Sequence, residues 1–75
     1  MKIKDRDLER MLRNMEEKIE ELKDSLRDSF VSLKRMLRRN DWWGVIADAE
    51  NIIEDASELK TLEDIYKAIK ERVEE

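Results

Sequence analysis

The feature that most constrains this chain is a run of apolar residues that repeats at helical spacing through its first half. Neighbouring members lie mostly four and three residues apart in alternation, and on a helical wheel they fall within about 40° of one direction. The members are Leu8, Leu12, Met15, Ile19, Leu22, Leu26, Leu33 and Leu37, with Ser29 at a seam position and Phe30 beside it filling the gap. This pattern predicts one straight helix over residues 5–39 that carries a single apolar stripe.

The residues that follow carry the signals of a tight turn between two helices. Asn40 tolerates the left-handed backbone conformation that closes a helix, and Asp41 is a favoured N-cap for the next one. Arg38 and Arg39 suit the negative end of the helix dipole. We therefore predict that the chain reverses direction at residues 40–41.

The second half of the chain carries two apolar stripes that point in different directions on a straight helix. The centres of the two stripes lie roughly 100° apart. The first stripe consists of Val45, Ala49, Ile52, Ile53, Ala56 and Leu59, and the second of Leu62, Ile65, Tyr66, Ile69 and Val73. Between them, Thr61 followed by Asp64 has the pattern of an N-cap. These observations predict a break near residues 58–61.

The predicted fold is all-α, in a single helical domain over residues 1–75. We expect a three-helix bundle with a long first helix and helices over about 5–39, 42–58 and 62–74. The alternative is a two-helix αα-hairpin that pairs with a second copy as a four-helix dimer. The sequence leaves open whether the third helix continues the second or folds back, and a fold-back would leave half of the first stripe to be covered by a partner.

Composition limits the chemistry that is available. The chain has no cysteine and no histidine, so it lacks disulfides, thiolate metal sites and the usual general base. It has one glycine, so it has no glycine-rich phosphate loop. We expect no enzyme activity, no cofactor and no metal site. Charged residues make up 48% of the chain with both signs interleaved, which favours a solvated helical surface.

Charge and hydropathy bear on partners and location. The longest apolar run, residues 42–47, is too short to span a membrane, and residues 1–7 hold no apolar signal segment, so a soluble protein in a cytoplasmic or recombinant context is expected. Residues 1–40 have a net charge of +3 and residues 41–75 of −7, which favours antiparallel packing of the two halves. The basic cluster at residues 34–39 is therefore interpreted as complementing the helix dipole and the acidic half, and not as a nucleic-acid site.

Two tryptophans and part of the first stripe are the candidate interface. Trp42 and Trp43 diverge by about 100° on a helix, so both rings cannot easily enter one core. Either the two rings close the end of a small core, or exposed tryptophan beside arginine marks an interaction hot spot. The candidate residues are Trp42, Trp43, Leu8, Leu12, Met15 and Ile19.

The sequence shows two resemblances. A highly charged helical chain without Pro, His, Cys or Gln resembles a computationally designed helical bundle, although hyperthermophile proteins share this balance. Residues 40–54 also resemble the second helix of a tetratricopeptide repeat with its turn. The first-helix pattern of the repeat and its later proline are absent, and the match occurs once. This second resemblance implies a helix-pair packing geometry and carries over no peptide-binding function.

The leading hypothesis for function is a designed or scaffold-like structural bundle with no biochemical activity and no required partner. The alternative is a small helical interaction protein that forms a homodimer or binds a partner helix through the stripe of the first helix.

Overall fold

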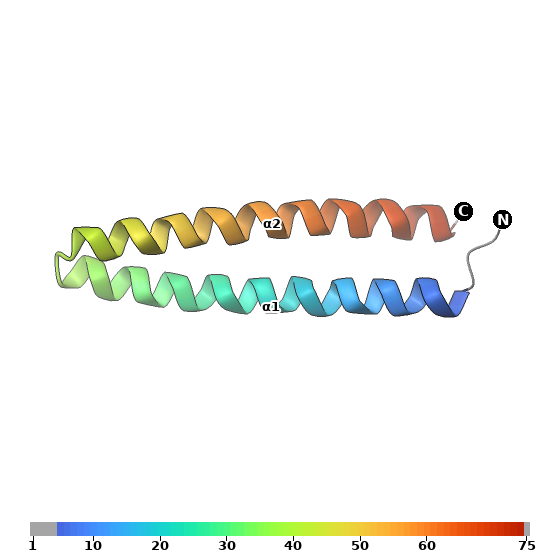
Figure 1. Ribbon diagram of the computed structural model, residues 1–75, viewed down its shortest axis with the longest axis horizontal. Helices are drawn as coiled ribbons and strands as arrows, with labels where there is room; N and C mark the ends of the chain where they lie inside the picture. The colour runs from blue at the N-terminus through green and yellow to red at the C-terminus, as the bar shows by residue number, and fades with distance from the viewer. Residues whose placement is uncertain (1–4, 75) are drawn as a thin grey trace.

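The protein is an antiparallel helical hairpin. The computed structural model describes residues 5–74, which form two long helices, α1 (Asp5–Arg38) and α2 (Trp42–Glu74), as Figure 1 shows. The molecule measures 57 × 15 × 14 Å. The all-α class and the long first helix are confirmed, as is the reversal of the chain after it. Residues 1–4, on which the expectation of no signal segment partly depends, lie outside the described residues.

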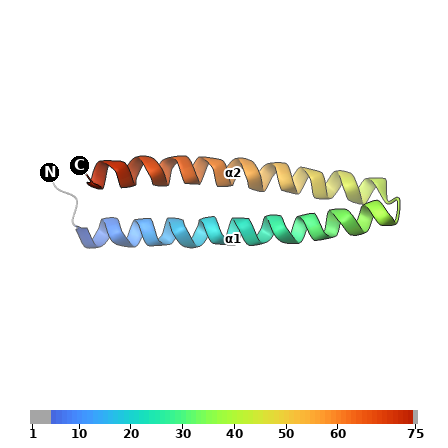
Figure 2. The ribbon, with the colours of Figure 1, turned by 180° about the vertical axis from the view of Figure 1, so that it is seen from behind.

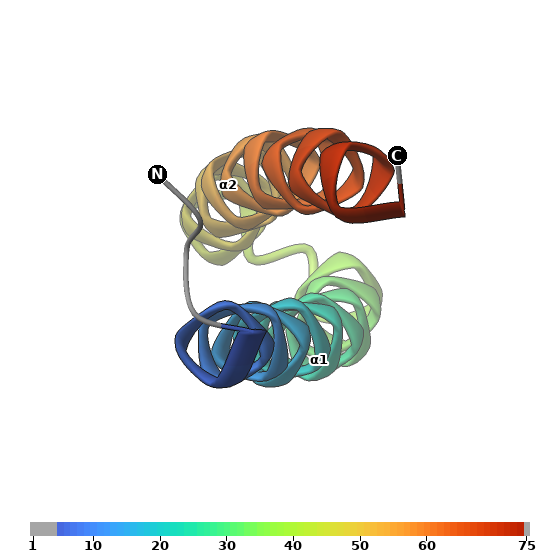
Figure 3. The ribbon, with the colours of Figure 1, turned by 90° about the vertical axis from the view of Figure 1, so that its right-hand side faces the viewer.

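The two helices stay side by side along their whole length. The view from behind shows the same close pairing (Figure 2), and the end-on view shows that the helices wind across one another (Figure 3). Such winding is expected when apolar residues repeat every 3.5 positions, because the helices must coil to keep the seam in contact. Within residues 5–74 each helix is therefore covered by the other and by no third helix.

The turn at residues 39–41 ends α1 and begins α2 with almost no intervening chain. Asn40 has a positive φ of 55°, as its left-handed role predicts. The backbone N–H of Asp41 donates to the carbonyl of Met36 (3.0 Å), and that of Asn40 donates to the carbonyl of Leu37 (3.2 Å), which is a Schellman cap. The Asp41 carboxylate then accepts from the backbone N–H of Gly44 (3.0 Å) and caps α2.

Gly44 allows the two helices to approach closely beside this turn. A Cβ atom at this position would lie 2.6 Å from the Met36 sulfur and 2.9 Å from its Cγ. A glycine in the first turn of α2 thus makes room for Met36, which fills the seam next to the turn.

The predicted break near residues 58–61 is wrong, because α2 runs without interruption from Trp42 to Glu74. One continuous helix replaces the expected helices over 42–58 and 62–74, and in the part of the chain that the structure describes no third helix folds back. Part of the apparent change in direction is the drift of about 20° per heptad that a straight helical wheel shows for a 3.5-residue repeat. Coiling of the two helices removes this drift.

The rest of the apparent change comes from which residues form the seam of α2. Residues 45, 48, 52, 55, 59, 62, 66 and 69 are the ones that turn toward α1, at the three-and-four spacing of a heptad seam, and all are at least partly buried. Two of these seam residues, Asp48 and Asp55, are acidic and were not counted in either stripe. Ile53 and Ala56, which were counted, are exposed and lie outside the seam.

Thr61 is not an N-cap. Its hydroxyl donates to the carbonyl of Ser57, one turn earlier in the same helix (3.0 Å). This bond is the usual way for a mid-helix threonine to satisfy its hydroxyl, and it leaves the helix intact.

Replacing Thr61 by alanine should therefore leave the free energy of unfolding unchanged or raise it by ~0.5 kcal/mol, because alanine has the higher helix propensity. Urea denaturation followed by circular dichroism measures the change. A loss of about 1 kcal/mol, the usual effect of removing a capping side chain, would indicate a helix start at Thr61.

The core of the hairpin is thin. Among the described residues, only Ile19 (8% exposed) and Leu22 (5% exposed) are buried, both near the middle of α1. The other apolar seam residues of the two helices are half-buried. Ser29 lies in the seam as expected, but Phe30, which was expected to fill the gap beside it, is 50% exposed. Leu37, which was expected in the stripe of the first helix, is 46% exposed, and Met36 takes its place in the seam.

Candidate functional site

Two serine–aspartate hydrogen bonds join the helices along one side of the seam. Ser32 donates to the carboxylate of Asp48 (2.8 Å), and Ser25 donates to that of Asp55 (2.7 Å). The two serines lie seven residues apart on α1 and the two aspartates lie seven apart on α2, so both bonds fall on the same side. We call this side of the hairpin the serine flank. It satisfies the two carboxylates that interrupt the seam of α2.

A third hydrogen bond lies on the opposite side of the seam. The Tyr66 hydroxyl donates to the carboxylate of Glu16, and this bond, together with desolvation and the negative charge of Glu16, raises the pKa of the Tyr66 phenol. The Lys70 ammonium lies 5.6 Å from the centre of the Tyr66 ring. These contacts join the two helices in the half of the hairpin away from the turn, which we call the open half, on the side opposite the serines.

The three bonds also define which residues lie at the same level. The residue numbers of each bonded pair add up to 80–82, so residues of α1 and α2 at one level add up to about 81. Around each helix the heptad positions follow the order a, e, b, f, c, g, d, so the a side borders e and the d side borders g. The serines occupy g positions and bond to aspartates at d positions, whereas Tyr66 and Glu16 occupy a and e.

The side opposite the serines is apolar in the half of the hairpin next to the turn. On α1 its e positions are Phe30 and Leu37. On α2 the residues at e and b positions are all apolar from the first turn to the middle of the helix. We call this set the apolar flank: Phe30, Leu37, Trp42, Ile46, Ala49, Ile53 and Ala56.

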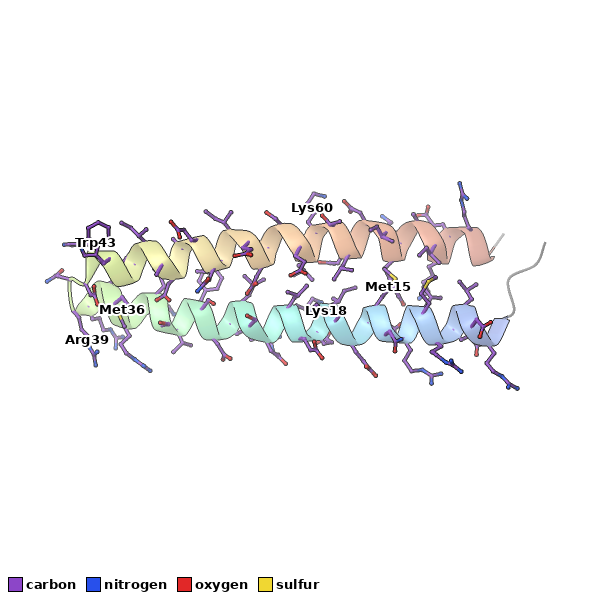
Figure 4. The ribbon with its side chains drawn as sticks, in the orientation of Figure 1. Met15, Lys18, Met36, Arg39, Trp43 and Lys60 are labelled. Carbon is purple, nitrogen blue, oxygen red and sulfur yellow. The ribbon has the colours of Figure 1, made fainter. Side chains whose placement is uncertain are left out.

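Most of the apolar flank is open to solvent. Phe30, Leu37, Trp42, Ile46 and Ile53 are all exposed, and Ile53 reaches 65%. Single exposed apolar residues are ordinary on protein surfaces, but a contiguous set of this size is typical of an interaction surface. The flank ends at Lys60, which Figure 4 shows pointing away from α1.

The two helices carry opposite charges in this same half of the hairpin. Residues 23–39 hold six basic and two acidic side chains, whereas residues 41–58 hold six acidic and no basic ones. The ion pairs among the described residues all lie within one helix: Lys23–Glu20 at 3.8 Å, Arg27–Asp24 at 2.9 Å and Lys60–Asp64 at 3.2 Å. The opposite charges of α1 and α2 are thus not paired with each other across the described part of the hairpin.

The surface area of the hairpin is large for its mass. A compact protein of 9.1 kDa exposes about 4,900 Å², and this chain exposes 6471 Å². The difference of roughly 1,600 Å² is about twice the area that each partner buries in a standard protein–protein interface. The hairpin therefore exposes more total surface than a compact monomer of this mass does.

The candidate interface residues from the sequence fall in two different places. Leu8, Leu12 and Met15 are half-buried and Ile19 is buried, all in the seam against α2, and Figure 4 shows Met15 between the helices. Trp42 belongs to the apolar flank. Trp43 is 83% exposed and points outward from α2, so neither tryptophan is enclosed in the core.

Four exposed residues of the apolar flank were not identified from the sequence as candidate interface residues: Phe30, Leu37, Ile46 and Ile53. The signal that identifies them is a second periodicity in α2. Residues 42, 46, 49, 53 and 56 also repeat at four-and-three spacing, one step around the helix from the seam. Once the seam is assigned to Val45, Ile52 and Leu59, these residues remain as a separate apolar row.

Other kinds of site find little support in residues 5–74. They contain no group of three or more acidic side chains placed so that it could hold a metal ion, and neither α1 nor α2 is apolar enough over sufficient length to cross a bilayer. A shallow depression near the open end is lined by Met11, Met15 and Leu62 with charged neighbours. The basic side chains at residues 34–39 are exposed over the last turns of α1.

Comparison with known proteins gives no match: no family model fits the sequence, and no curated protein or solved structure is significantly similar to it.

Proposed function

We propose that this chain is a structural, non-catalytic protein that works by self-association, with the apolar flank of one hairpin packing on that of a second copy. The product is a four-helix bundle made of two hairpins. The observation that carries the proposal is the exposed apolar row of α2 beside Phe30 and Leu37 of α1.

A second copy fits this surface better than an unrelated helix does. The flank joins a basic helix to an acidic helix, and a second hairpin brings the same two charges with it. A twofold dimer can place each helix against one of opposite charge. The excess exposed area, roughly 1,600 Å² per copy, is in the range that a permanent homodimer buries.

Sedimentation equilibrium over a range of concentrations tests the proposal. We expect a species of twice the 9.1 kDa chain mass at micromolar concentration, dissociating on dilution. A strict monomer at high micromolar concentration would contradict the proposal and favour a scaffold-like hairpin whose only property is folding.

A matched pair of variants locates the interface. Ile53→Glu places a charge in the apolar flank, and we expect it to raise the dissociation constant at least about 100-fold, because two buried charges per dimer lose their water. Ile65→Glu makes the same change at another exposed isoleucine of α2, which lies at a g position toward the opposite flank. This control should shift the constant by less than about threefold. Equal weakening by both variants would place the interface elsewhere, and circular dichroism checks that both stay helical.

A further inference from the structure

We infer that the two hairpins pack with their turns at the same end, so that α1 of each copy lies antiparallel against α2 of the other, around a twofold axis that runs along the helices. This inference rests on the proposed function, since it specifies the geometry of the same dimer. The competing geometry turns one hairpin end over end and places α1 against α1.

The position of the apolar flank favours the first geometry. The flank occupies the half of the hairpin next to the turn, and the same face of the open half carries Glu9, Glu16, Glu63 and Lys70 at its e positions. A twofold axis along the helices superimposes the two flanks over their whole length without any shift. The end-over-end geometry achieves this overlap only by sliding the hairpins until their open halves point apart.

Side-chain size also pairs α1 with α2. In this unshifted geometry, residues of α1 and of the partner's α2 at the same level also add up to about 81. Phe30 therefore lies level with residue 51 of the partner subunit, between its Ala49 and Ile53. Leu37 lies level with residue 44 of the partner subunit, between its Trp42 and Ile46. The large side chains of α1 thus meet a row that contains alanines, whereas in the other geometry Phe30 and Leu37 would meet a row that contains lysine and arginine.

Charge leads to the same pairing. Arg27 and Lys34 occupy the b positions of α1 beside the apolar flank, and Glu50 borders the flank on α2. With α1 against α2, the apolar stem of Lys34 covers the partner's Ile46 and its ammonium reaches toward the partner's Glu50. With α1 against α1, the same lysine would approach basic side chains of the second copy.

Distances between the open ends of the dimer test the geometry. The chain has no cysteine, so Arg10→Cys carries a single nitroxide spin label on the exposed side of α1. Leu33 lies at the middle of the apolar flank on α1, about midway between Phe30 and Leu37. Arg10 lies 23 residues from Leu33, which is about 35 Å along the helix. Pulsed electron–electron double resonance should give a distance between the two labels of about 20–40 Å if the turns lie together. The two copies of α1 are then diagonal helices of the bundle, about 14 Å apart, and each label extends outward from its helix.

The two ways of failing are distinct. A separation near 70 Å in a sample that sediments as a dimer would overturn the inferred geometry and leave the proposed function standing. A monomer in sedimentation would instead overturn the proposed function.

Charge reversal gives an independent test. At low salt Lys34→Glu should raise the dissociation constant about tenfold, and adding Glu50→Lys should return it to within about threefold of the parent, because the contact occurs twice per dimer. Arg35→Glu is the control, since it makes the same charge change one residue away at a c position outside the flank, and less than a threefold effect is expected. A tighter dimer in Lys34→Glu, or no recovery in the double variant, would overturn the inference.

Discussion

Leu22→Ala should lower the free energy of unfolding by about 3 kcal/mol and the thermal midpoint by roughly 10–20 °C. Leu22 is 5% exposed and lies level with Leu59, and among the residues whose burial is described only this stretch of the seam has buried side chains. Removing three carbons there leaves a cavity that a two-helix structure has no third element to fill. A domain of this size has a total stability of about 4–11 kcal/mol, so the variant should be partly unfolded at 37 °C.

Leu37→Ala provides the matched control, because the chemical change is the same and the residue is 46% exposed on the apolar flank. At concentrations where the protein is monomeric it should cost no more than ~1 kcal/mol. Thermal denaturation at one fixed low concentration measures both variants, since dimer formation would otherwise shift the midpoints. Equal losses in the two variants would mean that the hairpin has no localised core.

The first helix and the turn could be predicted from the sequence because their signals are local. The stripe of α1 is apolar at nearly every seam position, so its direction is the same whether or not the seam is known. Asn40 and Asp41 each perform the role that their side chains favour, a left-handed closure and an N-cap. None of these features depends on what the second helix does.

The continuity of α2 could not be predicted in the same way, because its seam is defined by its partner. Asp48 and Asp55 read as surface residues until Ser32 and Ser25 are placed opposite them. Ile53 was counted in an apolar stripe, and it is identified as a surface residue only once the seam is known to run beside it. On α2, apolar residues alone therefore do not identify the buried side. The partly polar row is the seam and the fully apolar row is mostly exposed, and only the contacts with α1 distinguish the two.

The candidate site follows from the same ambiguity. Trp42 was identified because two adjacent tryptophans cannot share a core, which is a local argument. Phe30 and Leu37 were assigned to the stripe of the first helix because their direction differs from the seam by only one step around the helix. Their exposure depends on Ser29 and Met36 taking the seam positions, and that choice is made by packing against α2.

Under the proposed self-association, the polar seam residues restrict contact to the apolar flank, which leads to the second large prediction. Replacing both Asp48 and Asp55 by leucine should raise the free energy of unfolding by ~2 kcal/mol and the thermal midpoint by about 10 °C. Each leucine fills a half-buried seam position and favours the helix more than aspartate does. These gains exceed the loss of two hydrogen bonds that are at most partly shielded from water, Ser32–Asp48 and Ser25–Asp55.

The same double variant should lose its defined oligomeric state. With leucines at both seam positions the serine flank loses its two carboxylates and gains two partly exposed apolar side chains beside Ser25 and Ser32. A second side of each hairpin can then associate, and sedimentation should show species larger than a dimer. Replacing both aspartates by asparagine removes the same two charges but keeps the side polar, and this control should remain a dimer with a stability within ~1 kcal/mol of the parent. A leucine variant that is less stable than the parent, or that stays strictly dimeric, would show that the serine–aspartate pairs do more for folding than for the choice of flank. The expected outcome is a more stable but less specific protein, because under the proposed self-association the carboxylates that weaken the seam also disfavour contact through the serine flank.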